Sequence, residues 1–152
     1  MKIKWPLLLL SIAAVIITAG IGSLFTDTGS WYQSVKPAIT PPNIVFPIVW
    51  TTLFILIAIS LYFALSSSKQ KLRTRIFSVY CINFILNILW SLFFFTLKSP
   101  IVAFIDLVLL WLSILFLLLI AWKKSKIAYY TLLPYIAWVS FAGILNVLVI
   151  LA

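Results

Sequence analysis

The sequence predicts an all-α integral membrane protein, in which five transmembrane helices form a single domain over residues 1–152. Apolar residues make up 65% of the 152 positions and charged residues only 9%, whereas about a quarter of the residues in soluble proteins are charged. The apolar residues fall in five runs, each long enough to cross roughly 30 Å of hydrocarbon as a helix. These runs lie at about 5–25, 43–66, 75–97, 100–122 and 128–151.

The first run needs a separate argument because it also resembles a signal peptide. Lys2 and Lys4 precede it, and Thr18-Ala19-Gly20 offers small residues for cleavage. The apolar stretch nevertheless continues through Leu24-Phe25, beyond the length of a typical signal sequence. A retained transmembrane helix is therefore the favoured interpretation.

The remaining runs begin or bend at recognisable signals. The turn-forming stretch 27–30 follows the first run, and Pro41-Pro42-Asn43 opens the second. The third run follows a basic gap. Ser99-Pro100 is typical of an N-cap with proline at the first helical position, so it opens the fourth run. Pro134 lies within the fifth run and predicts a kink there.

The basic residues are distributed unevenly between the two sides of the membrane. Nine of the eleven lie on one side: Lys2, Lys4, Lys69, Lys71, Arg73, Arg75, Lys123, Lys124 and Lys126. Only Lys36 and Lys98 lie on the other. The positive-inside rule therefore predicts a multi-pass protein of the cell membrane with a cytoplasmic N-terminus and an outside C-terminus. Because the charges sit in short gaps rather than on one polar face, we expect the lipid bilayer and no nucleic acid as partner.

Few side chains are suited to ordinary catalysis or metal binding. The sequence has no histidine, which removes the commonest general base, metal ligand and haem ligand. Asp27 and Asp106 are the only acids, which argues against a catalytic triad, a zinc site or a dicarboxylate site. We therefore expect no metal site and no required cofactor.

The connection between the first two runs, residues 26–42, is the only long one. A loop of this length in so small a bundle is usually functional or disordered, and its aromatic and proline content argues against disorder. We favour an ordered lid over the outer end of the bundle. The alternative is an interfacial anchor, with Trp31 and Tyr32 at the lipid headgroups.

Polar residues inside the apolar runs indicate either a site or helix packing. A carboxylate at Asp106 costs about 3 kcal/mol within hydrocarbon unless it is paired or protonated, so it suggests function. Asn83 and Asn87 share one helix face, but each of them alone, like Asn146, is more typical of packing between helices than of a site. At 1.5 Å per residue, several polar and tryptophan side chains lie in the outer half, as expected of a pocket: Trp50, Asn87, Trp90, Asp106, Trp138, Ala142 and Asn146.

Several motifs together resemble a known family. They are Trp31-Tyr32-Gln33-Ser34-Val35-Lys36-Pro37, Pro41-Pro42, Trp50-Thr51, Asn87 with Trp90-Ser91-Leu92-Phe93-Phe94, Asp106, Pro134-Tyr135-Ile136-Ala137-Trp138, Phe141-Ala142 and Leu145-Asn146. The set resembles the tryptophan-rich sensory protein/translocator protein (TspO/MBR) family, which includes the mitochondrial peripheral-type benzodiazepine receptor. The resemblance covers nearly the whole chain.

The resemblance implies a five-helix bundle, often a homodimer, that binds porphyrins and isoquinoline-carboxamide ligands in its outer half. By position, the ligand-binding residues would be Tyr32, Pro41, Pro42, Trp50, Asn87, Trp90, Asp106, Trp138 and Ala142. Trp50 and Trp138 match tryptophans linked to porphyrin photochemistry, so they are tentative catalytic residues. The cholesterol motif of animal members is absent after Asn146, so sterol binding is not expected.

Three functions follow from these expectations. The favoured one is a membrane receptor or sensor for porphyrins, chiefly protoporphyrin IX, and free-base porphyrin is favoured because there is no histidine. The second is an enzyme that degrades porphyrin with light and oxygen. The third is a tetrapyrrole transporter, which the uniformly apolar inner halves and the absence of an internal repeat argue against.

Overall fold

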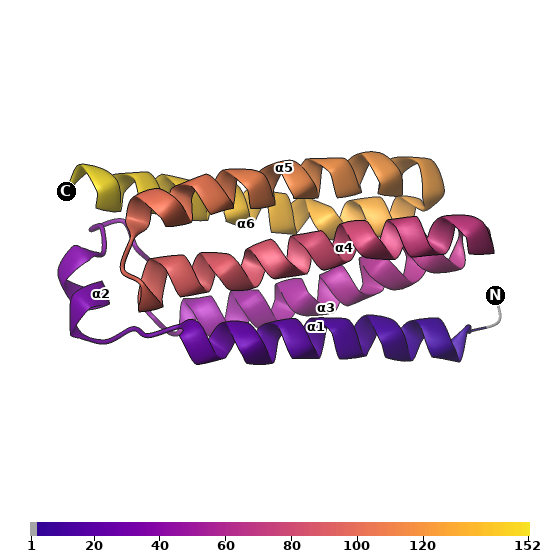
Figure 1. Ribbon diagram of the computed structural model, residues 1–152, viewed down its shortest axis with the longest axis horizontal. Coiled ribbons are helices and arrows are strands. Elements are labelled where there is room, and N and C mark those ends of the chain that lie inside the picture. The colour runs from indigo at the N-terminus through magenta and orange to yellow at the C-terminus, as the bar shows by residue number, and fades with distance from the viewer. Residues whose placement is uncertain (1–2) are drawn as a thin grey trace.

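The computed structural model describes residues 3–152, so Lys2 lies outside the described residues. The helices run along one axis and the termini lie at opposite ends (Figure 1). Their bounds are α1 Trp5–Phe25, α2 Ser30–Val35, α3 Val45–Ser66, α4 Gln70–Ser91, the π-helical turn η1 Leu92–Thr96, α5 Pro100–Lys124 and α6 Lys126–Leu151. Five of these spans are long and apolar enough to cross a membrane, which confirms the predicted five-helix bundle.

The helix boundaries differ from the predicted ones where polar residues extend a helix beyond its apolar run. The third span begins at Gln70 rather than near residue 75, because Lys and Arg are good helix formers and a helix continues beyond the hydrocarbon. It ends in η1 rather than in regular α-helix. The short helix α2 lies in the α1–α3 connection, residues 26–44, where only a lid of unspecified structure was predicted. Helix α6 continues through Pro134.

The five long helices form a closed ring. Helix α1 packs on α3 and α4, α3 packs on α6, α6 on α5, and α5 on α4. Neighbours in the sequence are therefore not always neighbours in the ring, since α1 lies between the successive helices α3 and α4. A ring of this kind encloses whatever space the side chains leave inside it.

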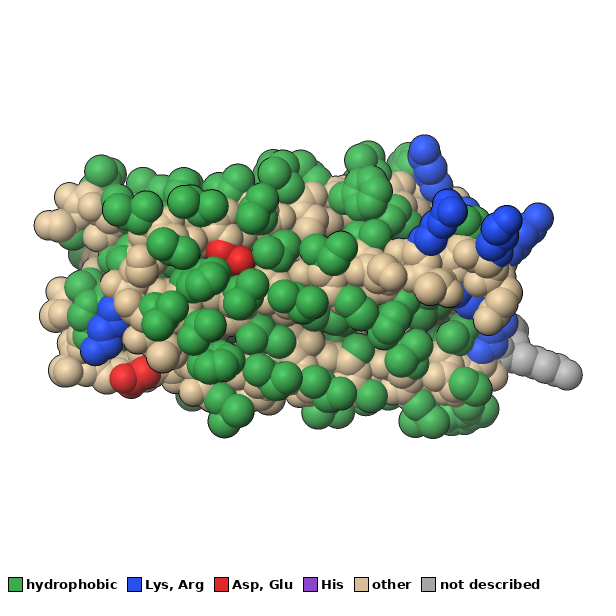
Figure 2. All heavy atoms as spheres, in the orientation of Figure 1, with side chains coloured by type: hydrophobic (Ala, Val, Ile, Leu, Met, Phe, Trp, Pro, Cys, Tyr) green, Lys and Arg blue, Asp and Glu red, His purple; other side chains and the backbone are tan. Residues whose placement is uncertain are grey.

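The two ends of the bundle differ in charge. Figure 2 shows lysine and arginine side chains gathered at the end where the chain begins. We call this the basic end; its described residues are Lys4, Lys69, Lys71, Arg73, Arg75, Lys123, Lys124 and Lys126. The opposite end, covered by the α1–α3 connection, is the loop end. Large apolar side chains cover much of the face between the two ends in Figure 2, as suits contact with lipid.

The half of the bundle near the basic end is tightly packed. Leu61 and Tyr80 are fully buried there, and the Tyr80 hydroxyl lies 2.7 Å from Ser60 Oγ, which donates to the Ala128 carbonyl at 2.8 Å. The Lys4 ammonium donates to the Ser66 carbonyl at 2.6 Å, so it satisfies the C-terminal end of α3. The bonds of Ser60 thus join α3, α4 and α6 within an otherwise apolar core.

Candidate ligand-binding cavity

A cavity of about 440 Å³ lies inside the ring near the loop end. This volume falls in the range of about 300–1,000 Å³ that small-molecule sites occupy. Four long helices, η1 and the α1–α3 connection contribute its lining. The lining residues are Thr18, Ala19, Gly22 and Ser23 of α1, Thr26, Thr28, Tyr32 and Asn43 of the connection, Phe46, Pro47, Trp50 and Phe54 of α3, Asn87, Trp90, Ser91 and Phe95 of α4 and η1, and Trp138 and Ala142 of α6.

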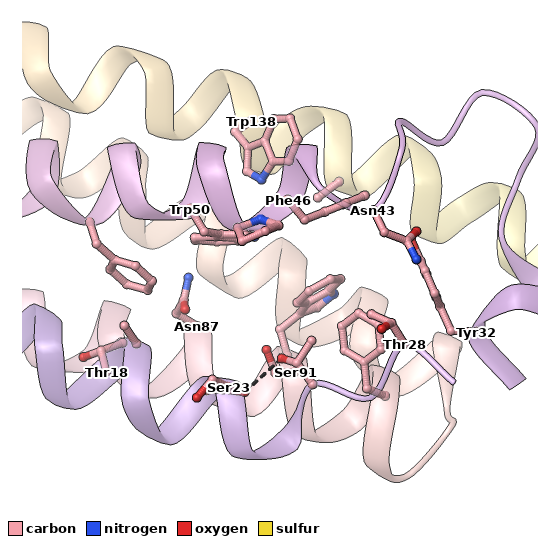
Figure 3. Close-up of a pocket in the computed structure, with 18 residues that line it drawn as sticks. Thr18, Ser23, Thr28, Tyr32, Asn43, Phe46, Trp50, Asn87, Ser91 and Trp138 are labelled. Atoms are coloured by element: carbon pink, nitrogen blue, oxygen red, sulfur yellow. Dashed lines mark hydrogen bonds between the residues drawn. The ribbon is translucent and has the colours of Figure 1, made fainter. Parts of the chain in front are cut away.

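Six of the nine residues predicted for a ligand site line this cavity: Tyr32, Trp50, Asn87, Trp90, Trp138 and Ala142. They come from α2, α3, α4 and α6, so the fold brings together residues that are far apart in the sequence. Figure 3 shows Trp50 and Trp138 on one side of the cavity and Thr18 and Ser23 of α1 on the opposite side.

The other three predicted residues do not line the cavity. Pro41 and Pro42 lie in the connection outside the lining. Asp106 is 5% exposed on α5, a helix that contributes no lining residue, and its Oδ2 has no hydrogen-bond partner among the described residues. Its depth in the membrane and the family resemblance were the bases of the prediction, but depth along a helix does not determine which face of the helix a side chain occupies.

The α1 wall of the cavity was not predicted. It consists of small side chains from Thr18 to Ser23, and nothing lies within 4 Å of a Cβ added to Gly22. The hydroxyls of Thr18 and Ser23 donate to carbonyls of their own helix at 2.8 and 2.7 Å. The cluster of small residues near the end of the first run was visible in the sequence, but small residues also occur wherever helices pack closely.

The three cavity tryptophans are held in different ways. Trp90 stacks on Phe94 with ring centroids 5.3 Å apart, and its indole N–H donates to Asn146 Oδ1 at 3.2 Å. The indole N–H groups of Trp50 and Trp138 have no hydrogen-bond partner within residues 3–152, although both rings line the cavity. The Trp90 N–H group is therefore already used in a hydrogen bond within the bundle, whereas the N–H groups of Trp50 and Trp138 have no acceptor among the described residues.

The α1–α3 connection closes the loop end of the cavity. Tyr32 is 7% exposed and packs on Phe95 at 5.4 Å, while Trp31 packs edge-on against Phe94 at 5.6 Å. Burial raises the pKa of the Tyr32 phenol above its ordinary value, so the hydroxyl stays protonated at neutral pH. The connection is thus anchored on η1 through aromatic contacts, as expected of a lid.

The family model for the TspO/MBR family matches residues 9–151, which is nearly the whole chain. The chain belongs to the TspO/MBR family. Its five-helix bundle and the motifs that resemble this family are thereby accounted for.

Similar members of the TspO/MBR family occur in bacteria and archaea. The tryptophan-rich protein TspO of Chlorobaculum tepidum is 39% identical over 91% of this chain and 90% of its own length. The tryptophan-rich protein TspO of Archaeoglobus fulgidus is 37% identical over 91% of this chain and 92% of its own. Protein CrtK of Rhodobacter capsulatus is 34% identical over 82% and 79%, respectively.

The lining of this TspO/MBR cavity suits binding better than acid–base chemistry. Among residues 3–152, no Asp, Glu, His or Cys lines it, so the serine, threonine and tyrosine hydroxyls of the lining have no general base beside them there. Aromatic and small apolar groups dominate, with polar atoms from Asn87, Tyr32, Asn43 and several serine and threonine hydroxyls. An arrangement of this kind holds a flat, largely apolar molecule that has a polar edge.

Proposed function

We propose that this TspO/MBR protein is a membrane receptor or sensor for porphyrins, chiefly protoporphyrin IX, and for isoquinoline-carboxamide ligands. The single observation that carries the proposal is the pair of indoles from Trp50 and Trp138, which line one cavity from two helices and keep their N–H groups free. Aromatic faces stack well on flat conjugated rings. A free-base porphyrin requires no axial ligand, which agrees with the absence of histidine from the chain.

The polar edge of the ligand would meet the Asn87 amide and the Tyr32 hydroxyl, which lie on different elements of the lining. Pro41, Pro42 and Asp106 stay in the proposal only as residues around the cavity, because none of them lines it. Lys36, in the connection, is the basic residue best placed to attract propionate groups to the loop end.

We propose that the loop end faces the outside of the cell membrane and that the N-terminus is cytoplasmic. The support is the charge distribution, with nine basic residues on one side and two on the other. Cysteine accessibility on intact cells tests this orientation, after Cys81 is replaced by Ser and a cysteine is placed at residue 2 or 152. Labelling at residue 152 and protection at residue 2 are expected; the reverse pattern contradicts the orientation.

The test of the proposed function is a titration of the purified protein with protoporphyrin IX in the dark, with tryptophan fluorescence measured at each step. Saturable quenching with one porphyrin per chain is expected. Competition by an isoquinoline carboxamide then checks that both ligand classes use one cavity. Quenching that rises linearly with porphyrin and never saturates would exclude a defined site.

The second candidate function is light-dependent breakdown of the bound porphyrin, with dioxygen as the oxidant. Trp50 and Trp138 favour it because an oxidisable indole at each position lines the same cavity. The product distinguishes the two functions. A receptor returns porphyrin unchanged after extraction, whereas an enzyme yields a distinct product over several turnovers under illumination.

Transport is less well supported. Leu61, Tyr80, Ile114 and Leu132 are each fully buried, and they belong to one continuous, mainly apolar core that fills the inside of the bundle. We also propose a homodimer on the basis of the family. Light scattering in detergent tests it, since a dimer has twice the mass of the 17.2 kDa chain.

A further inference from the structure

One buried amide holds the N–H edge of the Trp90 ring. The indole N–H donates to Asn146 Oδ1 at 3.2 Å, and Asn146 Nδ2 donates to the Pro100 carbonyl at 2.8 Å. These two bonds join α4, α6 and α5. Trp90 lines the cavity, whereas Asn146 is 1% exposed and does not line it. Asn146 therefore lies behind the cavity wall, in contact with a residue that forms it.

The partners of Asn146 fix its amide in one orientation. The Pro100 carbonyl can only accept a hydrogen bond, and the Trp90 indole can only donate one. The NH₂ group of Asn146 must therefore face Pro100, and its oxygen must face Trp90. A reversed amide would break both bonds at once, and a buried polar group without a partner costs free energy. The Trp90 ring is consequently fixed at its N–H edge.

The fixed Trp90 ring supports two neighbouring phenylalanines of η1. Phe94 stacks on it with ring centroids 5.3 Å apart and planes at 20°. Phe95 meets it edge-on, with centroids 5.7 Å apart and planes at 87°. The two phenylalanines also contact each other at 5.0 Å, and both are buried. Consecutive residues of η1 thus depend on one indole for their support.

Helix α2 lies at the loop end of the bundle (Figure 1) and packs on the same two phenylalanines. Trp31 contacts Phe94, and Tyr32 contacts Phe95. Within residues 3–152, no hydrogen bond joins α2 to a long helix or to η1, and the side-chain bonds of α2 stay within the α1–α3 connection. The ring contacts with η1 are therefore a main attachment of α2 to the bundle.

We infer that Asn146 is a positioning residue that keeps α2 closed over the cavity. Its amide holds the Trp90 ring, and this ring supports Phe94 and Phe95, on which α2 rests. Without the amide, the ring and η1 can shift together, and α2 loses its support. Asn146 thus sets how often α2 opens, and with it how fast a ligand enters and leaves. This inference rests on the proposed ligand-binding function and adds control of entry and exit at the same cavity.

A residue that holds a lid has a kinetic signature that a residue in contact with the ligand lacks. A lid that opens more often lets the ligand enter and leave faster. Both rate constants then rise, and their ratio, the Kd, changes little. Loss of a direct contact instead raises mainly the dissociation rate constant, and the Kd rises with it.

The first measurement uses Asn146→Leu, which keeps the approximate size of the side chain and removes both hydrogen bonds. Association of protoporphyrin IX is followed in the dark by stopped-flow quenching of tryptophan fluorescence, and dissociation by transfer of the porphyrin to protein-free lipid vesicles. Both rate constants should rise by about three- to tenfold, as the loss of about one net hydrogen bond implies. The Kd should stay within about twofold of the parent value.

The second measurement follows the mobility of α2 without any ligand. A spin label is attached to Ser34→Cys, an exposed position of α2, in a protein whose Cys81 is replaced by Ser. Its electron paramagnetic resonance spectrum should show faster motion in Asn146→Leu than in the parent. Trp90→Phe removes the same N–H group but keeps a ring on Phe94, so it should act likewise, and it carries the test if Asn146→Leu does not fold. Combining the two changes should add little, since both remove the same bond.

Ser140→Ala is the matched control. It removes the acceptor of another indole N–H, that of Trp111, in a bond of 2.8 Å that joins α5 to α6. Neither residue lines the cavity at the loop end. The variant should leave both rate constants for protoporphyrin IX and the spectrum of the label at residue 34 unchanged. Circular dichroism checks that each variant is folded.

The outcomes separate this inference from the proposed function. If folded Asn146→Leu raises only the dissociation rate constant, or neither rate constant, Asn146 does not control α2 and the inference is wrong. An unchanged label spectrum in both Asn146→Leu and Trp90→Phe leads to the same conclusion. If the parent does not bind protoporphyrin IX saturably, the proposed function fails, whereas the label spectrum still shows whether Asn146 holds α2.

Discussion

The basic-end half and the loop-end half of the bundle share the same five long helices but differ in what fills the ring. Near the basic end, large side chains such as Leu61 and Tyr80 are fully buried and hydrogen bonds join the helices. Near the loop end, α1 contributes small residues, and a cavity of about 440 Å³ is left. The cavity therefore lies where α1 contributes small side chains and no longer fills the ring.

The largest expected effect tests the packed half. Leu61→Ala removes a side chain that is 0% exposed, so it should lower the free energy of unfolding by about 3 kcal/mol. Phe54→Ala, on the same helix but at the cavity wall, should cost clearly less because its side chain already faces open space. Unfolding in mixed detergent micelles measures both, and equal losses would contradict the difference between the halves.

The next effect separates binding from chemistry at the cavity. Replacing both Trp50 and Trp138 by Phe retains aromatic contact but removes the easily oxidised indoles. Binding of protoporphyrin IX in the dark should weaken by about 1 kcal/mol per site, while light-dependent bleaching should fall much further. Fluorescence quenching and then absorbance under illumination are the measurements. Bleaching as fast as in the parent, at equal occupancy, would leave these tryptophans without a chemical role.

A smaller effect is expected at Asp106, which is buried outside the cavity lining. Asp106→Asn keeps the shape of the side chain and places a neutral group where the carboxyl has no partner for Oδ2. The fold should be retained, and porphyrin affinity should change by less than about 1 kcal/mol. A steep pH dependence of binding that disappears in this variant would show that Asp106 acts directly in binding.

The smallest effect concerns the pH dependence contributed by Tyr32. Burial raises the pKa of its phenol, so the hydroxyl remains a neutral donor below its ordinary pKa of about 10. Porphyrin affinity of the protein and of Tyr32→Phe should therefore differ by a constant factor between about pH 6 and 9. A ratio that changes across this interval would indicate that Tyr32 ionises within it.

The sequence was sufficient to predict the five spans, because hydrocarbon thickness and apolar run length are directly related. Depth along each run also placed Trp50, Asn87 and Trp138 in the outer half of the bundle, and all three line the cavity. Depth alone was misleading for Asp106, because the facing of a helix depends on neighbours far away in the sequence. Both Asn83 and Asn87 suited packing or a site, and only the folded bundle separates them, since Asn87 lines the cavity and Asn83 is fully buried.

The α1 wall and helix α2 were not predicted, because both depend on the surroundings of a residue in the folded bundle. The α1 wall consists of residues such as Gly22 that carry no chemistry and act by leaving space. Helix α2 has six residues in a connection whose stability depends on aromatic contacts with η1. A local sequence pattern reveals neither the space that α1 leaves nor the contacts between α2 and η1.

If the cavity at the loop end is the ligand site, the same substitution at two glycines of α1 should have different effects on binding. Nothing lies within 4 Å of a Cβ added to either Gly20 or Gly22, but Gly22 lines the cavity and Gly20 faces outward. Protoporphyrin IX affinity should fall more than about tenfold in Gly22→Leu, since the new side chain occupies the ligand's space. The affinity of Gly20→Leu should remain within about twofold of the parent. Equal affinities of the two variants, with both folded, would contradict the account.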